Sequence, residues 1–316
     1  MAHKFAGKIR YRVAMTGTEI GNHVLDLWSQ FRFINPDLLE DKFKDFKKEY
    51  IIYKGFGGFK IHKYRNIKKL TRKIHPYISI QKSVTGVKSQ FIEVPIDMPE
   101  AAKKQYKMME EEFITYVTSE TVISAPIVLA KLMKLSQISG GFIHSTEDEK
   151  DYPLHTAKLE ALKDLTDNLL EQDEKRVVIY ARFLWEIEQI KQLLAPDWVT
   201  FTIKGGVTIP EQKLAESLFN NSGGAMICQI DSGSESLNLQ SARYEIFYSF
   251  NYSSISFQQA LKRIDRQGQK AATCFYYILM CRGTIDRRIY RILRGKKDVL
   301  DEVRSLVADA QKGKLA

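Results

Sequence analysis

From residue 151 onward, the sequence predicts an α/β fold built on a parallel β-sheet. Short apolar runs that fit buried strands alternate there with longer segments whose apolar residues recur at helical spacing. The strand-like runs are apolar almost throughout, which is typical of parallel strands covered by helices on both faces. We therefore expect one parallel sheet with helices on both of its sides over residues 151–316.

The expected elements follow one another closely after Pro153. Helices are expected over residues 156–172, 184–194 and 211–219, and strands over 176–181, 199–203 and 226–230. The next expected strand, 244–250, leads into a helix that carries Gln259, Arg263 and Arg266. These three positions are spaced i, i+4 and i+7, so we expect them on one helical face. The last strand and helix are expected over residues 274–280 and 284–293.

The first 150 residues have a different character. We expect a buried strand over residues 12–15, a helix from about Asn22, a strand over 91–96 and helices over 100–118 and 119–138. Between Pro36 and Pro76, lysines and arginines are interleaved with aromatic residues, as in grooves that bind nucleic acids. A solvated basic face with its aromatic residues packed inward is an equally good interpretation.

The amino-acid composition narrows the classes of protein to which this chain can belong. The chain has 316 residues, of which 44% are hydrophobic and 27% charged, as in ordinary soluble globular proteins. No apolar run reaches membrane-spanning length. A net charge of +10 favours a polyanionic partner. The three cysteines lack CxxC spacing, which argues against a zinc site or a disulfide scaffold and fits a reducing, cytoplasmic compartment. We expect no metal site made by this chain alone.

Two segments near the C-terminus resemble motifs of the superfamily-two helicases, in the form found in Swi/Snf-type DNA translocases. The segment 259–269, QALKRIDRQGQ, is similar to their sixth motif, with Gln259, Arg263, Arg266, Gly268 and Gln269 in register. The segment 231–242, DSGSESLNLQSA, resembles their fifth motif. Its serines at 232, 234 and 236 stand where the family more often has Ala, Gly and Gly.

Other segments extend the resemblance. Residues 176–190 are similar to the fourth motif, and residues 11–36 are similar to the third, although Glu19 replaces its usual proline. In the family, the third motif is the last part of the first ATPase lobe. The resemblance thus implies three parts: a final strand and helix of a first RecA-like lobe (1–35), a basic helical insertion and linker (36–150), and a RecA-like helicase C-terminal domain (151–316).

The resemblance also implies roles for individual residues. In the family, ATP with Mg²⁺ lies between two lobes, so Arg263 and Arg266 are expected to reach the γ-phosphate, with Gln259 coupling them to the lobe interface. Residues expected to contact nucleic acid are Gly205, Gly206, Thr208, Ser232, Gly233, Ser234, Lys60, Lys63, Lys68 and Lys69. Residues expected to couple the nucleotide and nucleic-acid sites are Thr16, Gly17, Thr18 and Asn238.

Two features needed to hold ATP do not occur in this sequence. It contains no G-x-x-x-x-G-K-[ST] loop and no apolar strand ending in an acidic pair. The sequence therefore leaves enzymatic activity open. The chain could contribute arginine fingers and DNA contacts to a composite ATPase, with the first lobe on a separate chain, or it could be a catalytically inactive nucleic-acid-binding fragment. The form of the sixth motif favours double-stranded DNA over RNA.

Overall fold

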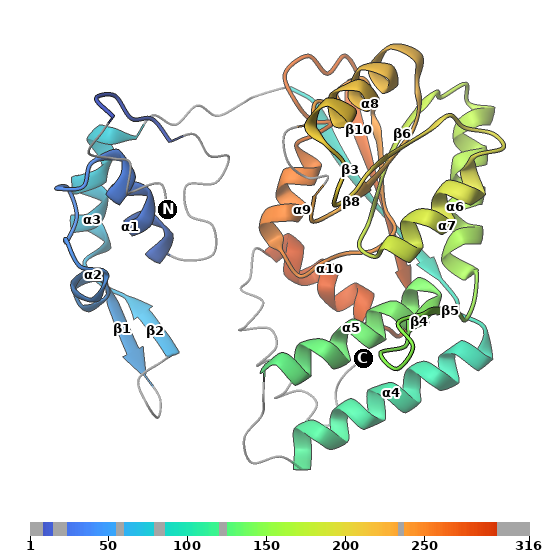
Figure 1. Ribbon diagram of the computed structural model, residues 1–316, viewed down its shortest axis with the longest axis horizontal. Coiled ribbons are helices and arrows are strands. Elements are labelled where there is room, and N and C mark those ends of the chain that lie inside the picture. The colour runs from blue at the N-terminus through green and yellow to red at the C-terminus, as the bar shows by residue number, and fades with distance from the viewer. Residues whose placement is uncertain are drawn as a thin grey trace. The chain divides into compact units, whose positions relative to one another are not determined.

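The computed structural model describes residues 9–14, 24–54, 60–78, 86–119, 125–232 and 237–295 (Figure 1). The chain divides into two compact units, Met1–Lys82 and Ser83–Ala316. The boundaries expected after residues 35 and 150 do not coincide with this division. Residues 36–82 belong to the first unit, and residues 83–150 belong to the same unit as the predicted parallel sheet.

The first unit is a small helical body with one β-hairpin. Its elements are α1 (Leu25–Ile34), α2 (Phe43–Tyr50), β1 (Ile51–Lys54), β2 (Lys60–Tyr64), α3 (Ile67–Ile74) and the short 3₁₀ helix η3 (His75–Tyr77). β1 and β2 pair in antiparallel fashion. The helices bury their apolar positions in a core made of Leu27, Phe31, Leu39, Phe46, Tyr50, Ile51, Leu70 and Ile74. This core is separate from that of the second unit.

The strand expected over residues 12–15 is not formed in the described residues. Residues 12–14 form neither helix nor strand, and the Val13 side chain is 79% exposed. In the described part of the first unit, the only strand pair is β1 with β2, so this segment has no neighbouring strand for its backbone groups. A short apolar run is insufficient for a strand when no partner strand accompanies it.

The second unit is built on a six-stranded sheet in the order β3-β10-β9-β6-β8-β7. All of its neighbouring strands run parallel. The strands are β3 (Lys88–Ile96), β6 (Arg176–Ala181), β7 (Thr200–Ile203), β8 (Gly224–Gln229), β9 (Tyr244–Phe247) and β10 (Thr273–Cys281). The predicted α/β fold with a parallel sheet is therefore confirmed.

The edge strand β3 extends the sheet beyond its expected limit. It pairs with β10 over its full length, from Lys88 opposite Thr273 to Ile96 opposite Cys281. This segment was expected to belong to the insertion before residue 151 and not to the sheet. Pro95 lies near the end of β3, and an edge position tolerates a proline because one side of the strand needs no ladder hydrogen bonds.

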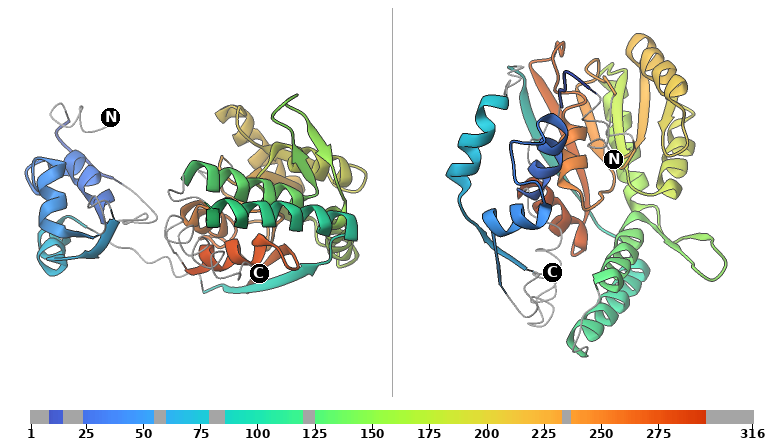
Figure 2. Two further views of the ribbon diagram at one scale, coloured as in Figure 1. Left: turned by 90° about the horizontal axis from the view of Figure 1, so that it is seen from below. Right: turned by 60° about the vertical axis from the view of Figure 1, so that its left-hand side comes forward.

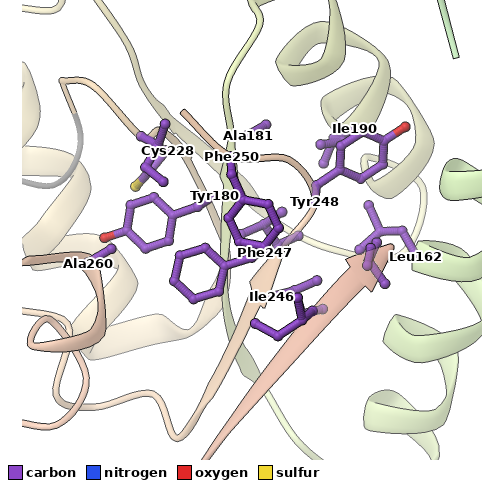
Figure 3. Packing of buried hydrophobic residues seen from close by; sticks show 14 of the residues in the cluster. Leu162, Tyr180, Ala181, Ile190, Cys228, Ile246, Phe247, Tyr248, Phe250 and Ala260 are labelled. Atoms are coloured by element: carbon purple, nitrogen blue, oxygen red, sulfur yellow. The ribbon is translucent and has the colours of Figure 1, made fainter. Parts of the chain in front are cut away.

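Helices cover both faces of this sheet. The helices α6 (Ala157–Glu171) and α7 (Leu184–Leu194) lie on one side, whereas α9 (Ser254–Leu261) and α10 (Ile285–Gly295) lie on the other (Figure 1). Figure 3 shows the same division inside the core, with Tyr180, Cys228 and Ala260 together on one side of the sheet. Ile190, Leu162 and Tyr248 lie together on the other side. β6 is almost completely buried because it has packing partners on both faces.

Further elements accompany the sheet. The helices α8 (Ile209–Ser222), α4 (Glu100–Ser119) and α5 (Ala125–Gly140) and the antiparallel hairpin of β4 (Phe142–His144) and β5 (Asp151–Pro153) complete the second unit. α4 and α5 lie side by side (Figure 2). The hairpin is not among the elements predicted from the sequence. Within the described ranges, no helix is both long enough and apolar enough to cross a lipid bilayer.

Candidate functional site

The two arginines of the sixth-motif segment converge on one backbone carbonyl. Nη1 of Arg263 donates to the carbonyl oxygen of Leu237 at 3.2 Å, and Nη1 of Arg266 donates to the same oxygen at 3.3 Å. The Leu239 N–H donates in return to the Arg263 carbonyl at 3.1 Å. These bonds join the segment that follows α9 to the loop between β8 and β9, so the fifth-motif and sixth-motif segments form one local structure.

The expected long helix through Gln259, Arg263 and Arg266 is wrong. α9 ends at Leu261, so only Gln259 lies on it. The Gln259 carbonyl accepts the Lys262 N–H and Nε of Arg263, both at 3.1 Å, instead of the Arg263 backbone N–H that would continue the α-helix. The Arg263 N–H bonds to the Ala260 carbonyl in a tighter i→i+3 pattern. The arginines are therefore brought together by a turn.

A fully buried carboxyl group interacts electrostatically with Arg263. Glu245 on β9 has no exposed surface, and neither of its carboxyl oxygens has a hydrogen-bond partner in the described structure. Burial raises the pKa of Glu245 well above its usual value, and the attraction of Arg263 opposes that rise. Glu245 is not among the site residues predicted from the sequence. The signal available was a charged residue inside the apolar run 244–250.

A second shared acceptor joins two of the predicted nucleic-acid contacts. Oε1 of Gln229, the last residue of β8, accepts the Gly205 N–H at 3.0 Å and the Ser232 hydroxyl at 3.1 Å. Gly205 follows β7 and Ser232 follows β8, so the amide links loops at the carboxyl ends of adjacent parallel strands. Gln229 is a site residue that the motif comparison did not single out, because its importance depends on the pairing of β7 with β8.

The other predicted residues of the Gly205 loop are placed by the start of α8. Gly206 has φ +90°, a left-handed conformation that favours glycine. The Thr208 hydroxyl and backbone N–H both donate to Oε2 of Glu211 at 2.8 Å, an N-terminal capping arrangement. Gly205, Gly206 and Thr208 are exposed, so a ligand can approach the loop.

Five of the predicted residues lie outside the described residues, and Asn238 lies beside the acceptor of the two arginines. Thr16, Gly17, Thr18, Gly233 and Ser234 lie outside the described residues. Asn238 is half-buried next to Leu237, and its carbonyl accepts Nδ2 of Asn220 at 2.9 Å.

In the described part of the basic segment of the first unit, one of the predicted lysines forms an ion pair with an acidic side chain and others do not. Lys63, Lys68 and Lys69 are exposed, and Nζ of Lys69 lies 2.7 Å from Oε1 of Glu49. Lys60 begins β2, and nothing further is described of its side chain. Residues 66, 68, 69, 72 and 73 line an open hollow of about 510 Å³. Tyr50 is buried in the core of this unit, so this aromatic residue packs inward, as the solvated-face interpretation requires.

A second buried carboxylate supports the carboxyl edge of the sheet. Oε2 of Glu186 accepts the backbone N–H groups of Arg182 and Phe183 at 3.2 and 3.1 Å and also accepts the hydroxyl of Ser249. Burial raises the pKa of Glu186 to about 7, although the Ser249 hydrogen bond and the attraction of Lys158 act in the opposite direction. This carboxyl group ties the end of β6 to the segment after β9.

The described residues offer no evident site for a metal ion. They contain no group of three or more His, Cys, Asp or Glu side chains that could hold a metal ion. Cys228, Cys274 and Cys281 are all free and buried. The candidate site therefore consists of two guanidinium groups, loop backbone N–H groups and hydroxyls, which suit phosphate oxygens.

Comparisons with known proteins identify one domain of the chain. Residues 157–268, which contain both arginines and both loops, match the helicase conserved C-terminal domain. The chain also has the fold of the C-terminal part of the Fun30 ATPase domain, with a TM-score of 0.59 at 13% identity, over 72% of this chain and 99% of that one. Residues 157–268 thus form a helicase C-terminal domain, and the chain is similar to superfamily-two, Swi/Snf-type helicases over most of its length.

The curated relatives of this helicase lobe are much longer. An uncharacterised ATP-dependent helicase of Mycoplasma genitalium is 24% identical over 97% of this chain, which spans 29% of that protein. A CHD3-type chromatin-remodeling factor of Arabidopsis thaliana is 24% identical over 91% of this chain and 24% of its own length. The Sulfolobus solfataricus SWI2/SNF2 ATPase core in complex with dsDNA matches 98% of this chain and 66% of that one, at 20% identity and a TM-score of 0.51.

Proposed function

We propose that this chain acts as the second lobe of an ATP-dependent DNA helicase or translocase and completes an ATP site whose other half is a first ATPase lobe. In this proposal, Arg263 and Arg266 contact the γ-phosphate, and Gln259 helps to hold them toward the lobe interface. The main support for the proposal is that both guanidinium groups bind the Leu237 carbonyl, which holds two permanent positive charges at one place.

The arginines keep the capacity to bind a phosphate. A guanidinium has five N–H donors, and Arg266 uses one of them on Leu237. Arg266 is exposed, so its remaining donors can meet a ligand. When ATP is bound, these charges would stabilise the negative charge that develops on the transferred phosphoryl group. The described residues include no acidic cluster for magnesium, so the proposal assigns Mg²⁺ and the phosphate cradle to the first lobe.

The proposal assigns duplex DNA to the loops at the carboxyl edge of the sheet. Gly205, Gly206, Thr208 and Ser232, with Gly233 and Ser234, would contact phosphates through backbone N–H groups and hydroxyls. The Gln229 link between Gly205 and Ser232 supports this assignment because it holds the two loops together at the carboxyl edge of the sheet. Thr16, Gly17, Thr18 and Asn238 would couple the two sites.

The lysines of the first unit are proposed as a second set of DNA contacts. Lys63 and Lys68 are exposed and form no ion pair with the residues described here, so they are available to phosphates. Lys60 and Lys69 belong to the same proposed set. Because contacts with phosphates release counterions, binding through them should weaken as salt increases.

The decisive experiment uses the chain with a first ATPase lobe supplied by fusion or as a separate polypeptide. DNA-stimulated phosphate release is measured for the wild type, Arg266→Ala and Arg266→Lys, with the chain alone as the baseline. We expect turnover to fall roughly a thousandfold in Arg266→Ala. Lysine should restore little because an ammonium cannot reproduce the planar fork. DNA affinity without nucleotide should remain within about twofold.

A matched control is Arg243→Ala, because Arg243 lies just before β9 and pairs with Glu174 instead of with Leu237. This control should retain most of the turnover. Near-normal turnover in Arg266→Ala would contradict the proposed role of this arginine. A wild-type assembly that binds DNA without any turnover would instead indicate a non-catalytic nucleic-acid-binding protein.

A further inference from the structure

The last described helix presents a row of arginines that none of the roles above uses. Arg287, Arg291 and Arg294 are exposed, and they follow one another along α10 at spacings of four and three residues. Residues at these spacings lie on the same side of a helix. The row is therefore a continuous basic surface along one side of α10.

The helix α10, which carries this arginine row, is firmly packed against the rest of the unit. The opposite side of α10 buries Ile285, Ile289, Tyr290, Ile292 and Leu293. The Arg294 guanidinium lies over the ring of Phe91 on β3, 5.0 Å from its centre, and over the ring of Tyr290 at 5.8 Å. Rings that pack against a guanidinium restrict its motion and leave N–H donors at its edge to bind an anion.

The row has no acidic partner in the part of the chain described here. Arg287, Arg291 and Arg294 form none of the ion pairs found among those residues, whereas Arg282, just before the helix, lies 3.6 Å from Asp97. Glu93 is exposed on β3 but pairs with none of the three. Like charges at this spacing repel one another. An anionic ligand would relieve this repulsion.

The spacing and the residue type indicate which anion. Arg287 and Arg291 are separated by about 6 Å along the helix axis, given a rise of about 1.5 Å per residue. Phosphates of one strand in a duplex lie about 3.4 Å apart along the duplex axis, so the distance from Arg287 to Arg291 spans roughly two phosphate intervals and each arginine can meet a different phosphate. All three residues are arginines, which bind phosphate oxygens in a bidentate manner.

The row is separate from the loops that follow β7 and β8. β10, which leads into α10, is separated from β7 by the strands β9, β6 and β8 in the sheet. With strands about 4.8 Å apart, β10 and β7 are roughly 19 Å apart. A ligand on α10 would thus occupy a different surface of the lobe.

We propose that the arginine row Arg287, Arg291 and Arg294 binds the phosphodiester backbone of a nucleic acid. The proposal rests on the proposed DNA-binding function and adds a surface to it. The contact depends on the charge and spacing of the phosphates and not on the identity of the bases. Binding is therefore independent of the nucleic-acid sequence. It extends the DNA contacts of the lobe from the carboxyl edge of the sheet to the α10 side.

The test measures the affinity of the full chain for a random-sequence 20-base-pair duplex, by fluorescence anisotropy, at a series of KCl concentrations. In Arg287→Gln/Arg291→Gln, the slope of log affinity against log salt should become shallower by roughly 1.8, since each phosphate contact contributes about 0.9. Arg287→Lys/Arg291→Lys keeps both charges and should retain most of the slope. Arg294 is left intact because it also packs on two rings.

The matched control is Lys150→Gln/Lys191→Gln, which removes the same charge from exposed positions outside the row. Its slope should remain within about 0.3 of the wild-type value. An α10 variant with the same slope as this control would overturn the inference while leaving the proposed function intact. A wild-type chain without salt-dependent DNA binding would contradict the DNA-binding part of the proposed function and the inference with it.

Discussion

Lys158 and Asp286 form a salt bridge in the interior of the helicase lobe. Nζ of Lys158 lies 2.7 Å from Oδ2 of Asp286, and their side chains are only 1% and 6% exposed. Asp286 also accepts the Ser139 hydroxyl at 2.9 Å and the Cys281 N–H at 3.1 Å. This pair joins α6 to the start of α10 and ties both to α5 and β10.

Removing the acidic partner should destabilise the lobe strongly. Asp286→Asn removes the carboxylate that pairs directly with the buried Lys158 charge, and we expect the free energy of unfolding to fall by about 3 to 5 kcal/mol. Urea unfolding followed by circular dichroism measures the change. Asp97→Asn is the control, because Asp97 pairs with Arg282 at an exposed position and should cost less than about 1 kcal/mol. Equal losses in the two variants would contradict the importance of burial.

The buried carboxyl group of Glu186 should make stability depend on pH. Its pKa is raised to about 7 in the folded state, whereas an unfolded glutamate has a pKa of about 4.3. Between these values the folded state binds more protons than the unfolded state, so stability should fall as pH rises. The loss should approach about 1.4 kcal/mol per pH unit for this group.

The variant Glu186→Gln isolates this effect because it keeps the shape and removes the titration. We expect the difference in unfolding free energy between wild type and variant to change with pH between about 4.5 and 7 and to level off above about pH 8. Urea unfolding at about pH 5, 6, 7 and 8 provides the comparison. Curves that remain parallel over this range would show that Glu186 keeps an ordinary pKa.

The amide of Gln229 should matter more for binding than for folding. Gln229→Ala removes the acceptor shared by the Gly205 N–H and the Ser232 hydroxyl, so the two loops lose their link. We expect affinity for duplex DNA to fall about tenfold, whereas the free energy of unfolding falls by about 1 kcal/mol. The control is Gln192→Ala on the exposed side of α7. Unchanged affinity in Gln229→Ala would separate these loops from DNA binding.

Arg263 and Glu245 should be energetically coupled. In Arg263→Gln, the buried Glu245 loses the positive charge that offsets the rise in its pKa. The same change in a Glu245→Gln background leaves no such carboxyl group. We expect a coupling energy of about 1 to 3 kcal/mol in a double-mutant cycle measured by urea unfolding at about pH 8. Additive effects would mean that Arg263 and Glu245 do not act on each other.

Much of the lobe follows from local sequence patterns. β6 and α7 occupy the expected residues 176–181 and 184–194, because apolar continuity and helical spacing are properties of neighbouring residues. The hairpin of β4 and β5 was missed because its strands of three residues are too short to show a period. The sixth-motif segment also singles out Arg263 and Arg266 by residue type and spacing alone, although their role remains a proposal.

The sequence by itself determined the parallel α/β lobe and the chemistry present in its motif segments. Only the tertiary structure decided how those groups meet. Arg263 and Arg266 converge because Leu237, more than twenty residues earlier, offers a carbonyl at the point where α9 ends. Gln229 joins two loops because β7 and β8 pair in parallel. Arg263 acts on the pKa of Glu245 because β9 holds that residue inside the sheet, opposite Val178 of β6. Such contacts depend on strand order and register, which join residues far apart in the chain and leave no local period to read.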